Sequence, residues 1–535
     1  MTPTHSIPFK ATNYFSTLIC DYLDESPQLK PFYHRFPRLS NFQTQMEEKA
    51  QSFPKENRDI LVASLMRQYE ELTLSKSTLG NLELLKAQNT FTVVTGHQLN
   101  LFTGPLYFFY KIVSTINLCK QLKKTYPESN FVPIYWMATE DHDFEEINFF
   151  NFNGKKIQWT RDANGMVGEL NLNELDEVFS VFSKELNLSE NASKLKELFK
   201  QAYLEHNHLT EAMRFLVNQL FGDYGLVIVD GNDADLKAEF APYMKEELTA
   251  QTSHTKVMEA NEALNQVNDS YKIQVNPREI NLFYVGGGIR ERIVLVEGRY
   301  LVNDTDLSFS EEEILELLEA HPERFSPNVI MRPLYQEVIL PNLCYIGGGG
   351  ELAYWLQLKS FFETQQIPFP MLLLRNSALL LSSKQLEKLE RLNVSIDELF
   401  LKQSDLKTKV TRAVSEIDID FSDQKKHLEK QFKDLYELAE KTDKSFKGAV
   451  AAQETKQIKG LENLEKRLLK AQKRKLEDHL NRVTEIQSAL FPNGSLQERQ
   501  ANFSEFYLEY GHQFQEKLLD VLNPLESEFV VLKTQ

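Results

Sequence analysis

Cysteine is scarce in this chain of 535 residues: it has three, at Cys20, Cys119 and Cys344. They form no Cys-x-x-Cys pair, and their wide spacing argues against a disulfide framework or a zinc site built from all three. Proline is absent between Pro370 and Pro492. Because proline interrupts helices, its absence over such a length favours long helices.

The sequence also lacks a long apolar run and a positive balance of charge. No stretch reaches the roughly 18 apolar residues that a membrane helix needs, and the opening residues show no secretory pattern. Asp and Glu number 77 against 60 Lys and Arg, which gives a net charge of −17. Such a surface repels nucleic-acid phosphates and anionic lipids. These absences predict a soluble, cytoplasmic protein that binds neither nucleic acid nor membrane.

What the chain does have is enough apolar sequence for more than one core. Hydrophobic residues make up 42% of it, and a chain of this length is expected to divide into two or three domains. Residues 91–94 and 131–137 are short buried-strand patterns, and residues 106 to about 124 between them have a helical pattern. Strand, helix and strand at this spacing predict a parallel sheet, to which residues 225–230 add a further strand.

The amino-terminal 90 residues, before this α/β pattern, are predicted to be helical. Two further segments interrupt the pattern. A helix-rich insertion is expected at about 150–220, and a second insertion at about 260–325. Within the second, residues 280–304 alternate as antiparallel hairpins around three glycines.

The carboxyl-terminal third has a different character. Narrow leucine stripes with three-four spacing, such as Leu461, Leu464 and Leu468, run through dense mixed charge. This pattern indicates a coiled-coil arm that dimerises. We therefore predict three parts: a core at 1–380, a coiled coil at 381–492, and a tail at 493–535 that packs back on the core.

The first candidate site is the polar loop TGHQLNLFTGP between the first strand and its helix. Open parallel sheets bind ligands at such a place, and the free N–H groups of a helix start favour phosphate or carboxylate. An ordinary strand-to-helix turn capped by Thr103 is the alternative. In the following helix, Tyr107, Lys111 and Ser114 form a polar stripe that either faces solvent or lines a pocket. The candidate binding residues of the loop are Thr95, Gly96, His97, Gln98, Thr103 and Gly104.

The second candidate site is the acidic run Glu140, Asp141, His142, Asp143, Glu145 and Glu146 after the second strand. Close like charges disfavour joint ionisation, so a bound cation, either a substrate ammonium group or Mg²⁺, would stabilise the run. A helix start with Asp141 as its cap is the alternative. That alternative leaves His142 unexplained, and histidine is the side chain suited to proton transfer near neutral pH.

Weaker anion-binding signals follow later in the chain. A run of four glycines, residues 347–350, precedes a helix, but it matches neither a dinucleotide fingerprint nor a P-loop. The sequence contains no nucleophile elbow and no His-Glu-x-x-His zinc motif. A phosphate or an ordinary cap would fit the start of the helix at residue 383. The candidate binding residues here are Arg332, Gly348, Gly350, Glu351, Arg375, Ser382, Ser383 and Lys384.

Five motifs in order resemble the BshC family, the cysteine-adding enzymes of bacillithiol biosynthesis. They are VVTGHQLNLFTGPLYFFYK, FVPIYWMATEDHDFEEIN, QVNPREINLF, SPNVIMRP and GGGGELAYWLQLK, and they span most of residues 90–380. The chain departs from the family pattern at His97, where glutamine is usual, and at Gly349, where proline is common.

The resemblance implies a Rossmann-like core similar to the catalytic domain of class I aminoacyl-tRNA synthetases, with connective insertions and a dimerising coiled coil. It implies a ligase that adds L-cysteine to glucosaminyl-malate, with ATP or ADP and Mg²⁺ as ligands and a homodimer as the assembly. Lys111 would contact phosphate together with the loop, Asp141 and Asp143 would hold a substrate ammonium group, and His142 would take a proton. Another amide-forming ligase or nucleotidyltransferase, and a non-catalytic coiled-coil scaffold, stay open as alternatives.

Overall fold

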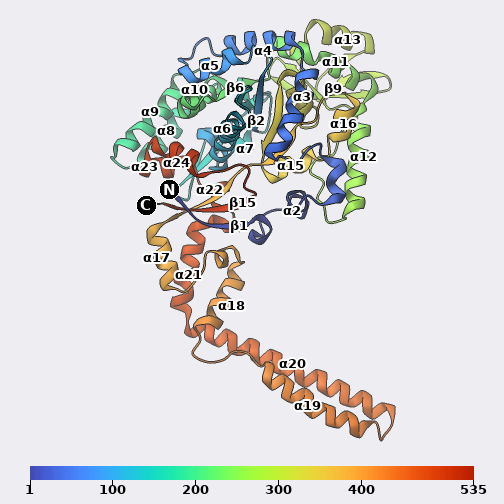
Figure 1. Ribbon diagram of the computed structural model, residues 1–535, viewed down its shortest axis with the longest axis vertical. Helices are drawn as coiled ribbons and strands as arrows, with labels where there is room; N and C mark the ends of the chain where they lie inside the picture. The colour runs from blue at the N-terminus through green and yellow to red at the C-terminus, as the bar shows by residue number, and fades with distance from the viewer. Residues whose placement is uncertain (535) are drawn as a thin grey trace. The chain divides into compact units, whose positions relative to one another are not determined.

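A computed structural model, which describes residues 1–534, divides the chain into two compact units (Figure 1). The first unit comprises Met1–Leu379 and Leu496–Leu532, and the second comprises Leu380–Ser495 with the residues from Lys533. The first unit is therefore discontinuous in sequence, because the chain leaves it, builds the second unit and returns. No helix of the part described is long and apolar enough to cross a membrane.

A five-stranded parallel sheet forms the centre of the first unit. Its strands, in spatial order, are β13 (Met371–Leu374), β12 (Asn342–Gly347), β2 (Thr90–His97), β3 (Asn130–Met137) and β6 (Val227–Asp230). Every residue of β2 is buried, as expected for the central strand of a parallel sheet covered on both faces. The predicted strand, helix and strand are confirmed as β2, α6 (Tyr107–Thr125) and β3.

The strand order reverses between β2 and β12. From β2 the chain builds outward through β3 to β6, and it later adds β12 and β13 on the other side of β2. Open parallel sheets bind ligands outside the carboxyl ends of the strands at such a reversal. His97 and Gly347 are the last residues of these two strands.

Helices cover the sheet with their apolar faces. α6 packs against β2, β3 and β12, α24 (Gln513–Val521) packs on α6, and α3 (Phe42–Ser52) packs against β12. One core cluster joins side chains of α3 and α6 to those of β2, β12 and β13. The remaining α-helices of this unit are α1 (Phe9–Thr12), α2 (Thr17–Leu23), α4 (Lys55–Gln68), α5 (Lys76–Leu84), α7 (Phe144–Ile147), α8 (Leu175–Glu185), α9 (Glu190–Leu204), α10 (Leu209–Phe221), α11 (Ala234–Ala250), α12 (Thr252–Val267), α13 (Glu311–Ala320), α14 (Met331–Ile339), α15 (Gly349–Trp355), α16 (Lys359–Thr364), α22 (Gln497–Gln500) and α23 (Phe503–Tyr510).

A second, antiparallel sheet belongs to the same unit. Its spatial order is β10 (Ser308–Phe309), β9 (Arg299–Val302), β8 (Ile289–Val296), β7 (Leu282–Gly286) and β11 (Phe325–Pro327). The predicted antiparallel hairpins at 280–304 are therefore confirmed. The other strands are β4 (Phe149–Phe152) and β5 (Lys155–Gln158), which form a hairpin, and β1 (Thr2–Pro8), β15 (Glu528–Thr534) and β14 (Ser377–Ser382), which form a three-stranded sheet.

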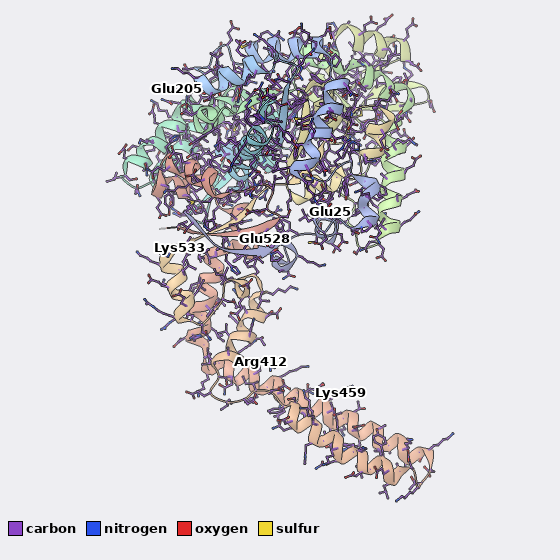
Figure 2. All side chains as sticks on the ribbon, in the orientation of Figure 1. Glu25, Glu205, Arg412, Lys459, Glu528 and Lys533 are labelled. Carbon is purple, nitrogen blue, oxygen red and sulfur yellow. The ribbon has the colours of Figure 1, made fainter. Side chains whose placement is uncertain are left out.

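The second unit is helical. Its helices are α17 (Ser383–Arg391), α18 (Gln403–Val414), α19 (Ser422–Ala439), α20 (Lys444–Lys475) and α21 (Glu477–Leu490). α19 and α20 lie side by side as a hairpin (Figure 1), with Phe432, Ala439 and Val450 as its small core. Figure 2 shows Arg412 on α18 and Lys459 on α20, long charged side chains of the kind that cover these helices.

Three sequence-based boundaries are wrong. β2 runs to His97, three residues beyond the predicted strand, so the first residues of the predicted loop are extended backbone. The Thr95 hydroxyl donates to the Ile346 carbonyl oxygen at 2.7 Å, which gives a polar residue a partner inside the sheet. The amino-terminal 90 residues contain β1 as well as helices. α15 begins at Gly349, so two of the four glycines lie inside that helix.

Candidate active site

A cavity of about 790 Å³ lies at the carboxyl ends of β2 and β3, next to the reversal of strand order. This volume is within the range of small-molecule sites. Its lining comes from the ends of β2 and β3, from α6, from the β7–β8 hairpin and from α14 and α15. Segments distant in sequence thus share one cavity of the first unit.

Ten of the residues predicted from sequence line this cavity together. They are Gly96, His97, Gln98, Tyr107, Lys111, Glu140, Asp141, His142, Arg332 and Glu351. The polar stripe of α6 divides: Tyr107 and Lys111 line the cavity, whereas the buried Ser114 bonds the Asn376 side chain at 2.9 Å. The start of the polar loop, the acidic run and Glu351, which follows the run of four glycines, therefore line one site.

Other predicted residues of the first unit do not line the cavity. Thr103 is buried, its hydroxyl has no hydrogen-bond partner, and it does not cap α6. Asp143 is exposed at the start of α7 and makes no capping bond. Arg375 is buried and donates to the Glu498 carboxylate at 2.7 Å. The predicted residues that stand outside the lining are Thr95, Thr103, Gly104, Asp143, Gly348, Gly350 and Arg375.

Three predicted residues, Ser382, Ser383 and Lys384, stand at the start of α17. Ser382 is the N-cap of that helix and accepts from the Gln385 N–H at 3.3 Å. The Ser383 hydroxyl donates to the Thr534 carbonyl oxygen at 3.1 Å. Both hydroxyl groups thus have roles in local structure, and a phosphate at this place stays a prediction.

The floor of the cavity is an ion pair between Lys111, which is buried, and Glu351, which is partly exposed. The Lys111 ammonium lies 2.7 Å from the Glu351 carboxylate and donates to the Gly96 carbonyl oxygen at 2.7 Å. Burial alone would raise the pKa of the Glu351 carboxyl. The Lys111 charge and hydrogen bonds from Lys111, the Gly348 N–H and the Tyr345 hydroxyl outweigh burial and leave that pKa lowered. The floor is therefore charged on both sides and fixed in place.

Gly96 leaves space above this floor. A Cβ atom there would lie 3.2 Å from the Tyr345 hydroxyl and 3.9 Å from a guanidinium nitrogen of Arg332. The Arg332 guanidinium donates to the Tyr354 hydroxyl at 3.3 Å and lies 5.9 Å from the centre of the Trp136 ring. The glycine thus keeps open a place where backbone, aromatic and cationic groups meet.

His97 lies beside the cavity but is an unsuitable base. Its ring is 7% exposed and packs against Tyr107 and Phe108, with ring centres 5.5 and 5.1 Å away. Burial, then the charges of Lys111 and Arg375, lower its pKa well below the ordinary value of 6.5. Its Nε2 atom is buried without a partner. The imidazole is therefore neutral at physiological pH.

The acidic run is held by hydrogen bonds and by one cation. The Gln98 amide donates to the Asp141 carboxylate at 2.8 Å and to Glu146 at 3.0 Å. Lys237 of α11, fully buried, places its ammonium 2.7 Å from the Glu140 carboxylate. Glu140 is thus neutralised within the protein, whereas Asp141, whose side chain is 29% exposed, has no cation as a hydrogen-bond partner.

Three arginines that sequence analysis missed as site residues line the same cavity as the acidic run. Arg278 precedes β7, and Arg290 and Arg292 belong to β8; all three line the cavity. Arg278 and Arg292 are exposed, and neither guanidinium is paired with a carboxylate in residues 1–534. The motif QVNPREINLF contains Arg278. Nothing in the sequence, however, placed the antiparallel sheet beside the acidic run.

The polar loop is strained and is held from outside. Phe102 and Thr103 have φ of 49° and 66°, a region that side chains other than glycine seldom adopt. The Asn502 amide donates to the carbonyl oxygens of Phe102 and Gly104 at 2.9 and 2.6 Å. The Tyr203 hydroxyl accepts from the Phe102 N–H at 2.8 Å. Residues far along the chain thus fix the loop, and no local signal in the sequence marks them.

A protein-bound metal has no evident set of ligands here. Across the described chain, no group of three or more His, Cys, Asp and Glu side chains is placed to hold a metal ion.

Comparison with known proteins assigns both halves of the chain to one family. Residues 2–376 match the family model described as "Bacillithiol biosynthesis BshC, N-terminal Rossmann-like domain". Residues 378–534 match "Bacillithiol biosynthesis BshC, C-terminal coiled-coil domain". The predictions of a Rossmann-like α/β core and of a coiled coil are therefore confirmed.

Relatives that match over nearly the whole chain carry the same name, "Putative cysteine ligase BshC". The protein of Christiangramia forsetii is 59% identical over 534 residues, 99% of each chain. That of Flavobacterium johnsoniae is 58% identical over 530 residues, again 99% of each. That of Cytophaga hutchinsonii is 38% identical over 97% of this chain and 96% of its own. A solved structure titled "crystal structure of putative arginyl t-RNA synthetase from Campylobacter jejuni" matches over 84% of this chain and 98% of its own, with 10% identity and a TM-score of 0.22.

Proposed function

The chain belongs to the BshC family of bacillithiol biosynthesis, and on that basis we propose that it is a cysteine ligase. In this proposal it joins the carboxyl group of L-cysteine to the amine of glucosaminyl-malate, which yields bacillithiol. One observation supports the assignment to the cavity most directly: the Asp141 carboxylate lines the same cavity as the guanidinium groups of Arg278 and Arg292, which pair with no carboxylate of residues 1–534.

The charges of the two substrates match this arrangement. Cysteine carries an ammonium group and a carboxylate, and glucosaminyl-malate carries an amine and two carboxylates. Asp141 would hold the ammonium group of cysteine, because it is the carboxylate of the run that lines the cavity and is not neutralised by a lysine. Arg278 and Arg292 would bind the malate carboxylates, since guanidinium pairs with carboxylate in two parallel hydrogen bonds.

ATP would supply the group that converts the cysteine carboxylate into a reactive acyl species. The cavity fits an anionic nucleotide in two respects: it contains cationic side chains, and Gly96 has no side chain at the place where phosphate could approach the backbone. Lys111 would have a structural role at the floor of the cavity, where it fixes Glu351 and Gly96, because its ammonium is already bound by the Glu351 carboxylate and by the Gly96 carbonyl oxygen. The chain would then contribute mainly orientation and charge stabilisation, each worth several kcal/mol.

We further propose that the protein is a homodimer through the α19–α20 hairpin. This hairpin has a small core of its own, and Leu435, Leu438, Phe446 and Leu464 are 41–53% exposed. Exposed apolar residues gathered on one two-helix arm are typical of an interface with a second helical pair.

Purified full-length protein tests the reaction. L-cysteine, glucosaminyl-malate and ATP are incubated with it, and the thiol product is identified by mass spectrometry. We expect bacillithiol from the wild type and at least a hundredfold lower rate from Asp141→Asn. Glu145→Gln, an exposed acid of the same run outside the cavity, should stay within threefold of wild type.

The co-products show how the carboxylate is activated. AMP with pyrophosphate would indicate transfer of the adenylyl group, whereas ADP with phosphate would indicate transfer of a phosphoryl group. Bacillithiol formed without nucleotide consumption would contradict the role of ATP. No bacillithiol under any condition, with another amine acylated instead, would contradict the choice of acceptor.

A further inference from the structure

His142 and Arg290, which both line the cavity, form a direct hydrogen bond. His142 lies in the acidic run after β3, and Arg290 lies on β8 of the antiparallel sheet. A terminal guanidinium nitrogen of Arg290 lies 2.8 Å from Nδ1 of His142. The two residues stand 148 positions apart in the chain, so the contact depends on how the second sheet packs beside the first.

Arg290 is buried against an aromatic ring, and the bond to His142 is the one hydrogen bond of its guanidinium in residues 1–534. Its side chain is buried, with a residue exposure of 8%, and its guanidinium carbon lies 3.8 Å from the centre of the Phe283 ring. The His142 ring packs on the same phenyl group, with centres 5.7 Å apart. Phe283 therefore contacts both the guanidinium and the imidazole.

A guanidinium group has only N–H donors, so the bond determines where the imidazole proton lies. Nδ1 of His142 must accept with its lone pair, and a neutral ring then carries its hydrogen on Nε2. The competing partner is too far: Oδ1 of Asp141 is 3.7 Å from Nδ1, beyond hydrogen-bond distance. The Asp141 carboxylate instead accepts from the His142 backbone N–H at 2.8 Å and from Gln98 at 2.8 Å.

The remaining nitrogen is available to a ligand. The His142 side chain is 54% exposed and lines the cavity, and Nε2 bonds to no other residue in the described chain. The charged groups around the ring are Asp141, Arg290 and, near Arg290, Glu140 and Glu291. Glu140 is already paired with Lys237. No carboxylate is therefore placed to draw the proton to Nδ1.

We propose that Arg290 is a positioning residue that holds His142 as the neutral Nε2–H tautomer. His142 then donates a hydrogen bond to a substrate oxygen, such as the acyl oxygen on which negative charge builds when the amine attacks. A donor already in place for developing charge stabilises a transition state more than a ground state. This inference rests on the proposed function, and it replaces the sequence-based hypothesis that His142 takes up a proton.

The tautomer is measurable without turnover. Full-length protein labelled with ¹⁵N-histidine is recorded by long-range ¹H–¹⁵N NMR at pH 7.5, and the His142 signals are assigned by their loss in His142→Gln. We expect an unprotonated Nδ1 and a protonated Nε2 in the wild type. In Arg290→Met the same ring should show mixed tautomers. A protonated Nδ1 in the wild type, or an unchanged pattern in Arg290→Met, would overturn the proposal.

Kinetics separate positioning from direct substrate binding. Arg290→Met should lower kcat 10- to 100-fold and leave KM for each substrate within threefold. Arg290→Lys, which keeps a cationic donor, should recover part of the loss. A rise in KM with kcat unchanged would mean that Arg290 binds the substrate itself and would overturn the positioning role.

A pair of variants at His142 tests donation against proton uptake. Glutamine places an N–H donor near the position of Nε2 but cannot accept a proton there, whereas leucine does neither. We expect His142→Gln to retain at least tenfold more activity than His142→Leu. Equal losses of activity in the two variants would indicate that His142 takes up a proton, and would overturn its role as a hydrogen-bond donor. The NMR result stands by itself, so an Nε2–H tautomer with no ligase activity would contradict the proposed function and leave the role of Arg290 in place.

Discussion

At the scale of single residues, the cavity and the core around it contain ion pairs whose partners come from different segments of the chain. Lys111 is bound by Glu351, Glu140 by Lys237 and Arg375 by Glu498. A buried ion pair contributes little net stability, but the loss of one partner leaves a buried charge uncompensated. These pairs therefore hold the shape of the site, and the cavity groups without an oppositely charged Asp, Glu, Lys or Arg partner, Asp141, Arg278 and Arg292, are left for ligands.

His97 should give the protein a pH-dependent stability. Its pKa is lowered in the folded state, whereas the unfolded chain protonates this ring near 6.5. Below that pH the unfolded state binds a proton that the folded state does not. Stability therefore falls as pH falls, by up to about 1.4 kcal/mol per pH unit for this one group.

His97→Gln should remove this contribution. Trp136, Trp159 and Trp355 all lie in the first unit, so tryptophan fluorescence during urea unfolding reports that unit alone. We expect the variant to lose less stability than the wild type between pH 6.5 and 5. Parallel pH dependence in the two proteins would mean that His97 does not resist protonation.

Individual site residues could be predicted where neighbouring residues in the sequence form a recognisable pattern. The end of a buried strand pointed to Gly96 and Gln98, and a run of acids pointed to Asp141 and His142. Arg290 could not be found in this way, because its partner lies on a different sheet. Asp143 was predicted, with Asp141, to hold a substrate ammonium group, but it lies outside the cavity lining.

At the scale of elements, buried strands and long helices followed from the sequence because their patterns are local. β3 and α6 lie within two residues of their predicted bounds. The end of β2 was predicted too early, since Thr95 and His97 look like loop residues until their neighbours in the sheet are known. The backbone conformation of the polar loop could not be predicted from local sequence, because it is strained and is held by Asn502, far along the chain.

Asn502 offers a test of how that loop is held. Asn502→Ala loses both donated hydrogen bonds to the loop and the cap of α23, at a cost of about 2 kcal/mol. Asn502→Asp keeps the capping oxygen but cannot donate. We expect fast hydrogen exchange of the loop amides in both variants, with α23 protected only in Asn502→Asp. Slow exchange of the loop in both would mean that other contacts hold it.

The α19–α20 hairpin carries the prediction about assembly. Leu435→Glu with Leu464→Glu places charges on exposed apolar positions of two helices, and it should weaken self-association at least tenfold. Lys459→Gln, a change at the exposed lysine of α20 labelled in Figure 2, is the matched control. Sedimentation velocity measures the assembly and circular dichroism checks the helices. A wild type that sediments as a monomer at micromolar concentration would contradict the dimer.

At the scale of the whole molecule, the first unit is closed by a segment that follows the second unit in sequence. Leu496–Leu532 supplies Glu498 to Arg375, Asn502 to the polar loop and α24 to the surface of α6. A chain ending at Leu379 would lack Glu498, the carboxylate partner of Arg375, together with the segment that helps to cover this part of the core.

We expect the chain 1–379 to lose cooperative unfolding. An internal deletion of 422–475, joined by a short glycine–serine linker, keeps the closing segment and should preserve the unfolding midpoint of the first unit. Tryptophan fluorescence again follows that unit. A truncated chain with the same midpoint as the full chain would show that the closing segment is dispensable.

The discontinuity of the first unit also sets the order of events on the ribosome. The 116 residues Leu380–Ser495 must be synthesised before the segment that closes the core. At about 5–20 residues per second, the nascent core stays incomplete for roughly 6–23 seconds while the second unit is synthesised. A messenger RNA cleaved before codon 498 encodes a chain without Glu498 and the rest of the segment that completes the core. Translation to the final stretch thus becomes a condition for an assembled cavity, and prematurely released chains are left as substrates for proteolysis.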